Sequence, residues 1–341
     1  MLLGHIIPQK TLLQSTKKHG MLCSPSGTSP GHPNQNAMRT TFKLFLSCLF
    51  CLVLPLASGV GNEDEVFVLL TPVVPEQTAE QEQTVEQEQT VEQARIVEPE
   101  RKEGEAGYRM TLTINDVEYP FRWCPPGTFM MGSPTSEEGR NHHEIQHQVT
   151  LTQGFWMLET EVTQAMWQST MGQNPSARKS DKLPVETVSW NDCQEYIQRL
   201  HSLGVAPVGY RFSLPTEAQW EYACRAGTTT PFHFGDTIDR DKANFGRNWA
   251  RTTEVGLYPA NAWGLYDMHG NVWEWCLDWY GDYPNGNITD PVGTSEGTNR
   301  VLRGGGWFHL AGDCRSAFRR DREPSVRNHA MGMRLALVRV E

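Results

Sequence analysis

The distribution of tryptophan is the feature that most limits how this chain can fold. All 11 tryptophans of the 341-residue chain lie between Trp123 and Trp307. Aromatic side chains bury large apolar areas, so a gathering of this kind marks where a hydrophobic core forms. We therefore predict that the packed core lies in the last two-thirds of the chain and that the first third has a different role.

Charge changes along the chain in a similar way. Residues 1–58 carry five basic and no acidic side chains, residues 59–107 carry 13 acidic and 3 basic, and residues 108–341 carry 27 acidic and 22 basic. The net charge of −10 argues against nucleic acid as a partner, because phosphate binding needs clustered Lys and Arg. A hydrophobic content of 38% with 21% charged residues is typical of a globular protein and excludes a polytopic membrane protein.

Residues 38–59 have the order of a secretory signal. A basic start precedes an apolar run over residues 44–54, and the small residues Ala57 and Gly59 follow. The apolar run is too short to cross about 30 Å of hydrocarbon as a helix. We therefore predict a signal peptide over 38–59, no permanent membrane span, and export to the periplasm, the cell envelope or the extracellular space. Residues 1–37 show no periodic pattern, which indicates a non-native or untranslated extension.

Residues 60–107 contain a low-complexity tract rich in Glu and Gln. One segment repeats almost verbatim from Glu80 to Gln93. Few apolar groups and strong like charge leave too little surface to bury against the entropy cost of ordering. A short coiled helix is the alternative, but the six-residue repeat departs from the seven that a coiled coil requires. We predict a disordered linker over 60–107 in front of one domain over 108–341.

The domain over residues 108–341 shows short elements separated by many turns. Alternating patterns over 108–114 and 117–123, on either side of Asn115 and Asp116, predict a β-hairpin. Capping residues predict three helices, two of which begin with capping boxes. The predicted starts are Thr163, Ser189 and Thr216, and the predicted ends of the last two helices are Gly204 and Gly227. The chain beyond is rich in Gly, Pro, Asn and Asp, which favours a loop-rich α+β domain over a βαβ array.

Seven segments of this domain resemble one known family in order and spacing. They are residues 125–133 (PPGTFMMGS), 161–163 (EVT), 184–190 (PVETVSW), 211–223 (RFSLPTEAQWEYA), 264–275 (GLYDMHGNVWEW), 303–307 (RGGGW) and 332–335 (GMRL). By these segments the chain is identified as a divergent member of the formylglycine-generating enzyme family, also called the sulfatase-modifying factor domain family. The resemblance implies a loop-rich variant of the C-type lectin fold with low regular secondary structure and a calcium-supported core. In agreement, we interpret the tryptophans at 273, 275 and 279 as core residues rather than a ligand platform.

The resemblance also implies an oxidoreductase chemistry, from which this chain departs. Members of the family carry two cysteines, five residues apart, after an Arg-Gly-Gly-Ser segment. These cysteines hold copper(I), and dioxygen then converts the cysteine of a Cys-x-Pro-x-Arg segment in a sulfatase to formylglycine. Thiolates are the soft ligands that select copper(I). Counted from Arg303, the two positions are His309 and Cys314, and the serine is Gly306.

Three interpretations of His309 and Cys314 follow. The pair could form a mixed site for copper or another transition metal, since both residue types are competent ligands. They could be relics in a binding pocket that has lost oxidation, or Cys314 could be a buried apolar thiol. Whether the chain is an enzyme stays open. We expect either a metal-dependent oxidase acting on a protein or peptide thiol, or a non-catalytic, lectin-like module that binds a peptide or glycan, in both cases a monomer.

The family resemblance predicts a calcium site in the segment that follows Asp267. The implied ligands are the side chains of Asp267 and Glu274 and the backbone carbonyls of Gly270, or alternatively His269, and of Val272. Carboxylate and carbonyl oxygens are the donors that calcium prefers. Asn271 and Asp278 add further oxygen donors nearby.

Three other groups of residues leave alternatives open. Arginines 315, 319, 320, 322 and 327 are interpreted as salt-bridged loop structure with the interleaved Asp313, Asp321 and Glu323, and anionic-ligand binding is the alternative. His142, His143 and His147 are interpreted as solvated imidazoles rather than a metal site. Cleavage of the leader would leave five cysteines, Cys124, Cys193, Cys224, Cys276 and Cys314, so at least one is unpaired. Cys193 and Cys224 could be bridged or merely packed.

Overall fold

The computed structural model describes residues 102–340, so the predicted extension, the signal peptide and most of the predicted linker lie outside the described residues. The domain opens with the predicted hairpin, β1 (Arg109–Ile114) and β2 (Val117–Cys124), paired antiparallel. Asn115 and Asp116 form its turn with φ of 49° and 62°. Asn and Asp tolerate this left-handed backbone better than most residues, which explains why the turn forms here.

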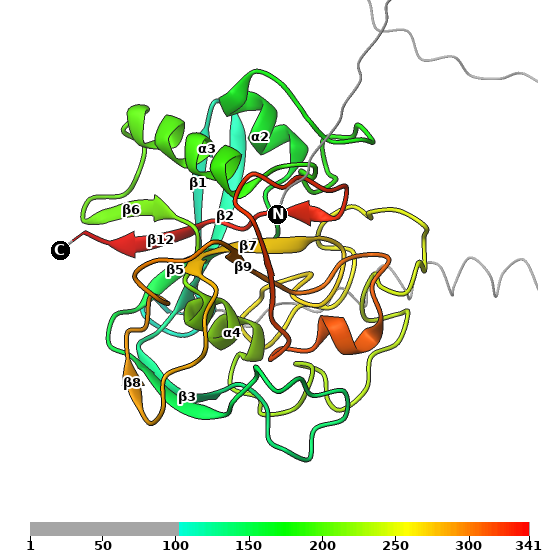
Figure 1. Cartoon of the computed structure of the whole chain (residues 1–341). Coiled ribbons are helices and arrows are strands. Elements are labelled where there is room, and N and C mark those ends of the chain that lie inside the picture. Colours follow the sequence, from blue (N-terminus) through cyan, green and yellow to red (C-terminus); the bar gives the residue numbers. More distant parts are fainter. Residues whose placement is uncertain (1–101, 341) are drawn as a thin grey trace, which may run out of the picture. The chain divides into compact units, whose positions relative to one another are not determined.

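The hairpin begins a five-stranded sheet that also contains the end of the domain. Its order is β1-β2-β5-β12-β6, with β5 at Phe155–Leu158, β6 at Tyr210–Ser213 and β12 at Ala336–Arg339 (Figure 1). The last strand, β12, pairs antiparallel with both β5 and β6. The first and last strands of residues 102–340 therefore lie in the same sheet.

Two of the predicted helices pack together over this sheet. They are α2 (Gln164–Met171) and α3 (Trp190–Ser202), and the Thr163 and Ser189 side chains cap them as expected. Gly204, with a φ of 64°, follows the end of α3. The larger of two hydrophobic cores forms between these helices and the sheet, and in it Trp167 stacks on Tyr196 at 4.9 Å. Local capping signals thus placed these two helices correctly.

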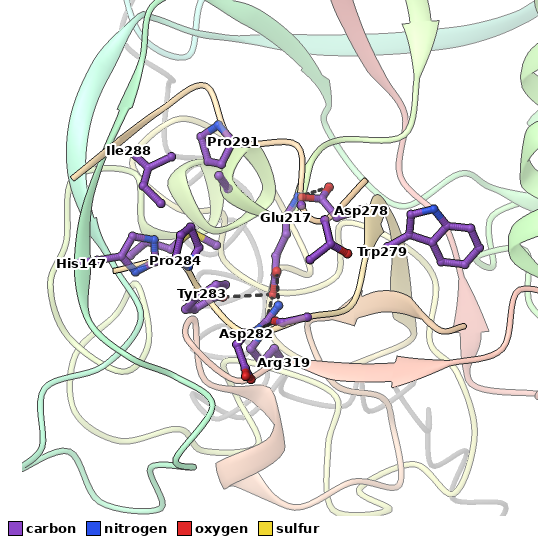
Figure 2. Close-up of a pocket in the computed structure, with 15 residues that line it drawn as sticks. His147, Glu217, Asp278, Trp279, Asp282, Tyr283, Pro284, Ile288, Pro291 and Arg319 are labelled. Atoms are coloured by element: carbon purple, nitrogen blue, oxygen red, sulfur yellow. Dashed lines mark hydrogen bonds and ion pairs between the residues drawn. The ribbon is translucent and has the colours of Figure 1, made fainter. Parts of the chain in front are cut away.

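The third predicted helix, α4 (Glu217–Arg225), contacts a different set of strands. It packs against β3 (Gly127–Met131), β7 (Trp273–Trp279) and β9 (Arg300–Arg303), where the second core contains the fully buried Trp220. Thr216 caps its start, and Ala226 and Gly227 end it in left-handed conformations. Its first backbone amide, that of Glu217, donates to the Asp278 carboxylate at 2.8 Å (Figure 2). Segments far apart in sequence therefore meet at the start of α4.

Two smaller sheets complete the domain. The first has the order β10-β9-β7-β11, with β10 at Arg320–Arg322 and β11 at Met331–Gly332; the second has the order β3-β4-β8, with β4 at His147–Leu151 and β8 at Ile288–Thr289. On β7, Trp273 and Trp275 are buried as predicted, whereas Trp279 is partly exposed and lines a cavity. The register of β7 against β9 shifts between Trp275 and Trp279, so the buried Trp275 and the partly exposed Trp279 lie on either side of an irregularity in the strand pairing.

Loops make up much of what remains, which confirms the loop-rich α+β class. Residues 226–272 contain no helix or strand, and buried amides hold them together: Asn261 bonds to the Ala223 and Cys224 carbonyls at 2.7 and 3.2 Å. A short 3₁₀ helix, η1 (Ala311–Cys314), was not predicted. All five cysteines of residues 102–340 are buried and free, so Cys193 and Cys224 are packed rather than bridged. Among the helices of this part of the chain, none combines the length and apolar content that crossing a bilayer requires.

Candidate functional site

His309 lies in a cavity of about 220 Å³ formed by the turn after β9 together with β7, β10 and β11. The residues that line it are Trp273, Phe308, His309, Arg320, Arg322, Val326, Asn328 and Met331. The Trp273 indole donates to the His309 ring, with Nε1 3.2 Å from Nδ1, and Phe308 stacks on the same ring at 4.2 Å. The imidazole is thus held between two aromatic side chains.

The glycines after Arg303 explain how the turn reaches this shape. Gly304 and Gly305 have φ of 93° and 79°, a region that L side chains rarely adopt. A Cβ atom on Gly305 would lie 2.4 Å from the Cys314 thiol, so the backbone must pass directly over the sulfur. The turn therefore directs His309 into the cavity while it covers Cys314.

The structure places the two predicted catalytic residues in different environments. His309 is partly exposed and lines the cavity, whereas Cys314 is fully buried at the end of η1 and does not line it. Burial raises the pKa of the Cys314 thiol well above its usual range, and the neighbouring Asp313 adds to this. Burial and the Arg320 guanidinium lower the pKa of His309 to about 4. At neutral pH the site therefore offers a neutral imidazole and a protonated thiol, not the thiolate that copper(I) prefers.

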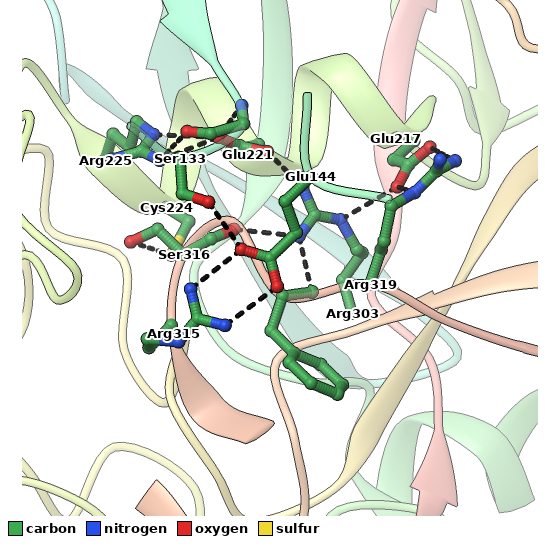
Figure 3. A network of polar contacts seen from close by, with 12 residues as sticks. Ser133, Glu144, Glu217, Glu221, Cys224, Arg225, Arg303, Arg315, Ser316 and Arg319 are labelled. Atoms are coloured by element: carbon green, nitrogen blue, oxygen red, sulfur yellow. Dashed lines mark hydrogen bonds and ion pairs between the residues drawn. The ribbon is translucent and has the colours of Figure 1, made fainter. Parts of the chain in front are cut away.

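The five arginines between residues 315 and 327 divide into those that form ion pairs and those that do not. Arg315 binds Glu144 at 2.8 Å and Glu137 at 2.5 Å, and Arg319 binds Glu217 at 2.6 Å (Figure 3). Arg327 pairs with Asp192 at 2.6 Å on the surface. Salt bridging was predicted correctly for these three, but the proposed partners Asp313, Asp321 and Glu323 were wrong. The true partners come from distant segments of the chain.

Arg320 and Arg322 differ from the other three arginines. Within residues 102–340 neither guanidinium forms an ion pair with a carboxylate, and both line the cavity of His309. Arg320 lies over the Trp273 ring, 5.6 Å from its centroid. Burial and the charge of Arg322 lower the pKa of Arg320, and the charges of Asp313 and Asp321 offset part of this shift. The cavity is therefore positively charged and aromatic.

The predicted calcium ligands lie in a buried acidic cluster. The Glu274 carboxylate already has protein partners, because Arg334 binds it at 2.7 Å and the Trp220 indole donates to it at 2.7 Å. Asp267 accepts from the Gly256 amide through one oxygen, while its other oxygen is buried without a partner. Burial and the nearby charge of Glu274 raise the pKa of Asp267 to about 6.

Glu161 is a member of this cluster that the sequence did not reveal. Its carboxylate is fully buried, and its contacts to the Asn271 amide and the Val272 backbone amide are long, at 3.3 and 3.4 Å. Burial and the charges of Asp267 and Glu274 raise its pKa well above the usual range. Gly270 belongs to the same segment, and a Cβ there would lie 2.3 Å from the Asn244 carbonyl.

The fit of this cluster to calcium is good at Asp267 and poor at Glu274. Asp267 has a free buried oxygen and Glu161 is weakly bonded, whereas both oxygens of Glu274 are occupied. No three His, Cys, Asp or Glu side chains of residues 102–340 converge on one metal position. A cation here would thus need backbone carbonyls as well, as predicted for Gly270 and Val272. Asp278 lies apart from the cluster, at the start of α4.

The three neighbouring histidines differ in their surroundings: the exposed His142 has its ring 3.6 Å from that of His143, whereas His147 lies apart from both on β4. His143 lies in a turn, 3.9 Å from the Asp282 carboxylate. His147 is on β4 and is buried, with its ring 4.7 Å from that of Tyr283. The interpretation of solvated imidazoles was therefore wrong for His147, which tertiary packing brings into the interior.

Comparisons with known proteins agree with these observations. A family model described as "Sulfatase-modifying factor enzyme 1-like domain" matches residues 120–339. The chain is 34% identical over 192 residues to a formylglycine-generating enzyme of Streptomyces coelicolor, covering 50% of this chain and 58% of that protein. It is 42% identical over 160 residues to a protein of Chlamydia caviae named serine/threonine-protein kinase pkn1, covering 46% of this chain. That match spans only 24% of the kinase-named relative.

Solved structures show the same fold over nearly their whole length. Treponema denticola variable protein 1 matches with a TM-score of 0.60 and 29% identity, covering 67% of this chain and 98% of that one. PvdO from Pseudomonas aeruginosa matches with a TM-score of 0.60 and 28% identity, covering 68% and 98%. The similarity therefore covers the described domain.

Proposed function

Because the chain belongs to the sulfatase-modifying factor family, we propose that it is a recognition module of this family that binds an anionic group of a peptide or glycan in the cavity of His309. The observation that carries this proposal is the pair of arginines, Arg320 and Arg322, which line the cavity without a carboxylate partner in residues 102–340. A partly desolvated guanidinium is costly until it is paired, so the wall favours an incoming carboxylate, sulfate or phosphate.

The other walls define the rest of the ligand. Phe308 and Val326 supply apolar surface beside the two guanidinium groups, and the buried Trp273 closes the wall behind Arg320. A sugar ring or an apolar side chain packs well on such a surface, while its acidic group reaches Arg320 or Arg322. An acidic glycan or a peptide with a carboxylate next to an apolar residue matches both features.

Oxidation of a cysteine is the second candidate, because family members perform it and because His309 is a neutral imidazole that could bind copper. Copper would supply dioxygen activation when bound. Three features disfavour it: His309 replaces a cysteine, Cys314 is buried away from the cavity, and its thiol is protonated. A Cys-x-Pro-x-Arg segment also carries a positive charge, which Arg320 and Arg322 would repel.

We also propose a structural calcium ion and an exported location. Calcium would be held by Asp267, by Glu161 and by the carbonyls of Gly270 and Val272, where it would neutralise carboxylates that repel one another. The support is the unpartnered buried oxygen of Asp267. The support for export is the signal-like segment over 38–59, which lies outside the described residues.

The recognition proposal is tested with pairs of probes that differ only in a negative charge. Calorimetry would compare N-acetyltryptophan with N-acetyltryptophanamide, and glucuronic acid with glucose. We expect an acid to bind and its neutral partner not to bind. Arg320→Met and Arg322→Met should each weaken binding about tenfold, the worth of one charge-assisted hydrogen bond. Arg327→Met, which removes a paired surface arginine, is the matched control.

Two results would contradict the proposal. One is equal binding of the acidic and neutral probes, and the other is equal loss of binding in the Arg320→Met and Arg327→Met proteins. The oxidase candidate is tested by incubating the protein with copper(I), oxygen and a Cys-x-Pro-x-Arg peptide. Conversion of the peptide thiol to an aldehyde, abolished by Cys314→Ala, would establish it, and an unchanged peptide mass would reject it.

A further inference from the structure

A second cavity, of about 280 Å³, lies at the start of α4 (Figure 2). Its walls come from β3, β4, β8, α4, the end of β7 and the loop that follows it, and it shares no lining residue with the cavity of His309. The cavity is smaller than most drug-sized sites, and would hold a ligand on the order of ten to fifteen non-hydrogen atoms.

The wall contains a buried carboxylate without a cation. Asp278 is 3% exposed and forms no ion pair within residues 102–340. One of its oxygens accepts from the Glu217 backbone amide at 2.8 Å. Desolvation by burial and the charge of Glu217 raise the pKa of Asp278 to about 7.

The one arginine in the wall does not balance Asp278. Arg319 gives its donors to Glu217, at 2.8 and 2.6 Å, and to the Gly281 carbonyl at 2.8 Å. Tyr283 also donates to Glu217, at 3.1 Å (Figure 2). Glu217 is fully bonded, because the Arg303 guanidinium also lies 3.3 Å from it. Arg319 and Arg300 act on Asp278 only through charge at longer range, so Asp278 has no direct ion pair within residues 102–340, and Asp282 is exposed at the edge of the cavity.

Capping of α4 does not account for this carboxylate. Thr216 and Gln219 already provide a reciprocal capping box for the helix. Glu217 adds one negative charge at the same end, so a second carboxylate at Asp278 brings repulsion that a helix dipole offsets only in part. Arg319 and Arg303 neutralise Glu217, so the carboxylate that a positive group in the cavity would stabilise is that of Asp278.

The remaining walls suit an organic body rather than a bare metal ion. His147 and Trp279 lie on opposite sides of the cavity in Figure 2, with Tyr283 between them. Ile288 and Met131 add aliphatic surface. Arg319 already lies over the Tyr283 ring, at 3.9 Å from its centroid, and Arg300 lies over the Trp279 ring, at 3.3 Å. The surface left for the body of a ligand is therefore that of His147, Ile288 and Met131.

We propose that this cavity binds a small organic cation, with an ammonium group at Asp278 and an apolar body against His147, Ile288 and Met131. An anionic ligand would face Asp278 directly, and a neutral one would leave its charge unbalanced. The site is independent of the anion-binding cavity, so the two can be tested in one protein.

The test uses phenethylammonium chloride as the probe and 2-phenylethanol as its neutral counterpart, titrated into the purified full-length protein by calorimetry or NMR. We expect saturable binding of the ammonium compound and at least about tenfold weaker binding of the alcohol. Asp278→Asn should weaken phenethylammonium binding by a similar factor, while Asp282→Asn, at the exposed edge, should change it about twofold or less.

A second variant covers the case in which Asp278→Asn fails to fold. Ile288→Trp fills the cavity from its rim without touching Asp278, and it should abolish binding while the circular dichroism spectrum stays that of the wild type. Arg320→Met should leave phenethylammonium binding unchanged. Absence of saturable binding in the wild type, or equal binding of the alcohol, or unchanged binding in both Asp278→Asn and Ile288→Trp, would overturn the proposal.

Discussion

Arg319 and Arg320 are neighbours in the chain, yet they belong to two different kinds of region. Arg319 is buried, is held by both oxygens of Glu217 and is part of the framework beneath α4. Arg320 is the first residue of β10 and faces the cavity of His309 with no ion pair in the described part of the chain. Pairing, rather than residue type or burial alone, therefore distinguishes Arg319, which is part of the framework, from Arg320, for which we propose a ligand.

The same contrast applies to the acidic residues. Glu144 and Glu217 are buried and paired with Arg315 and Arg319. Asp278 and Asp267 are buried to a similar degree but have no ion pair within residues 102–340. Each unpaired charge marks a proposed site: an anion at Arg320, an organic cation at Asp278 and calcium at Asp267. Four predictions test whether this division holds.

The largest effect is expected from Arg319→Met. This change leaves the buried Glu217 carboxylate with only the Arg303 guanidinium, at 3.3 Å, and the Tyr283 hydroxyl, at 3.1 Å, so we expect the free energy of unfolding to fall by about 3–5 kcal/mol. Arg320→Met removes an unpaired charge and should change the same quantity by less than about 1 kcal/mol. Urea unfolding of both variants measures the difference. Similar losses of stability in the two variants would contradict the distinction between the paired Arg319 and the unpaired Arg320.

The next effect is a pH dependence at Asp278. Its pKa is about 7 in the folded protein against 3.8 for an ordinary aspartate, so the folded state favours the protonated form. Its contribution to stability is complete below about pH 4 and is lost as the pH rises through 7. Relative to Asp278→Asn, the wild type should therefore lose stability between pH 4 and 8. Each pKa unit corresponds to about 1.4 kcal/mol, which gives a change of about 1–4 kcal/mol.

Urea unfolding of the two proteins at pH 4, 6 and 8 measures this change. A difference between wild type and Asp278→Asn that does not vary with pH would show that Asp278 has an ordinary pKa. Saturating phenethylammonium should recover part of the loss at pH 8, because the bound cation balances the carboxylate.

Calcium should have a smaller effect on stability. A ligand at a hundredfold its dissociation constant stabilises the folded state by about 2.7 kcal/mol, so a chelator should lower the melting temperature of the wild type by several degrees. Asp267→Asn removes a proposed ligand and should be nearly insensitive to the chelator. Asp282→Asn is the control with an unrelated exposed carboxylate. Equal chelator sensitivity in wild type and Asp267→Asn would reject the site.

The smallest effect is expected at a charge that is paired but exposed. Arg327 binds Asp192 with a side chain that is 51% exposed. Surface pairs of this kind contribute about 0–1 kcal/mol, so Arg327→Ala should barely shift the urea midpoint. A loss as large as that of Arg319→Met would show that pairing without burial is enough to hold this fold.

Local sequence signals predicted a considerable part of the fold. The hairpin turn at Asn115 and Asp116 and the three helix caps were correct, because each depends on residues within about four positions of one another. The family segments identified the fold class and the positions of His309 and Cys314. η1 was missed because it is a single 3₁₀ turn with no side-chain cap at Leu310.

The site could be predicted only in part, for a physical reason. The five arginines look alike in sequence, and their partners lie far away: Glu144 is 171 residues from Arg315, and Glu217 is 102 residues from Arg319. Glu161 and Asp267 belong to one cluster although they are 106 positions apart by their residue numbers. A local sequence pattern cannot predict contacts between residues that are this far apart in the chain.

The region of the tryptophan core, the helix caps and the family follow from the sequence, as does the presence of His309 where the family resemblance places the first of two cysteines. Tertiary packing was needed to learn that the Gly304–Gly305 turn covers Cys314 while His309 lines a cavity, and to learn which charges are paired. The reason is that backbone geometry follows from neighbours in the chain, whereas the burial of a thiol and the partner of a charge depend on how distant segments pack.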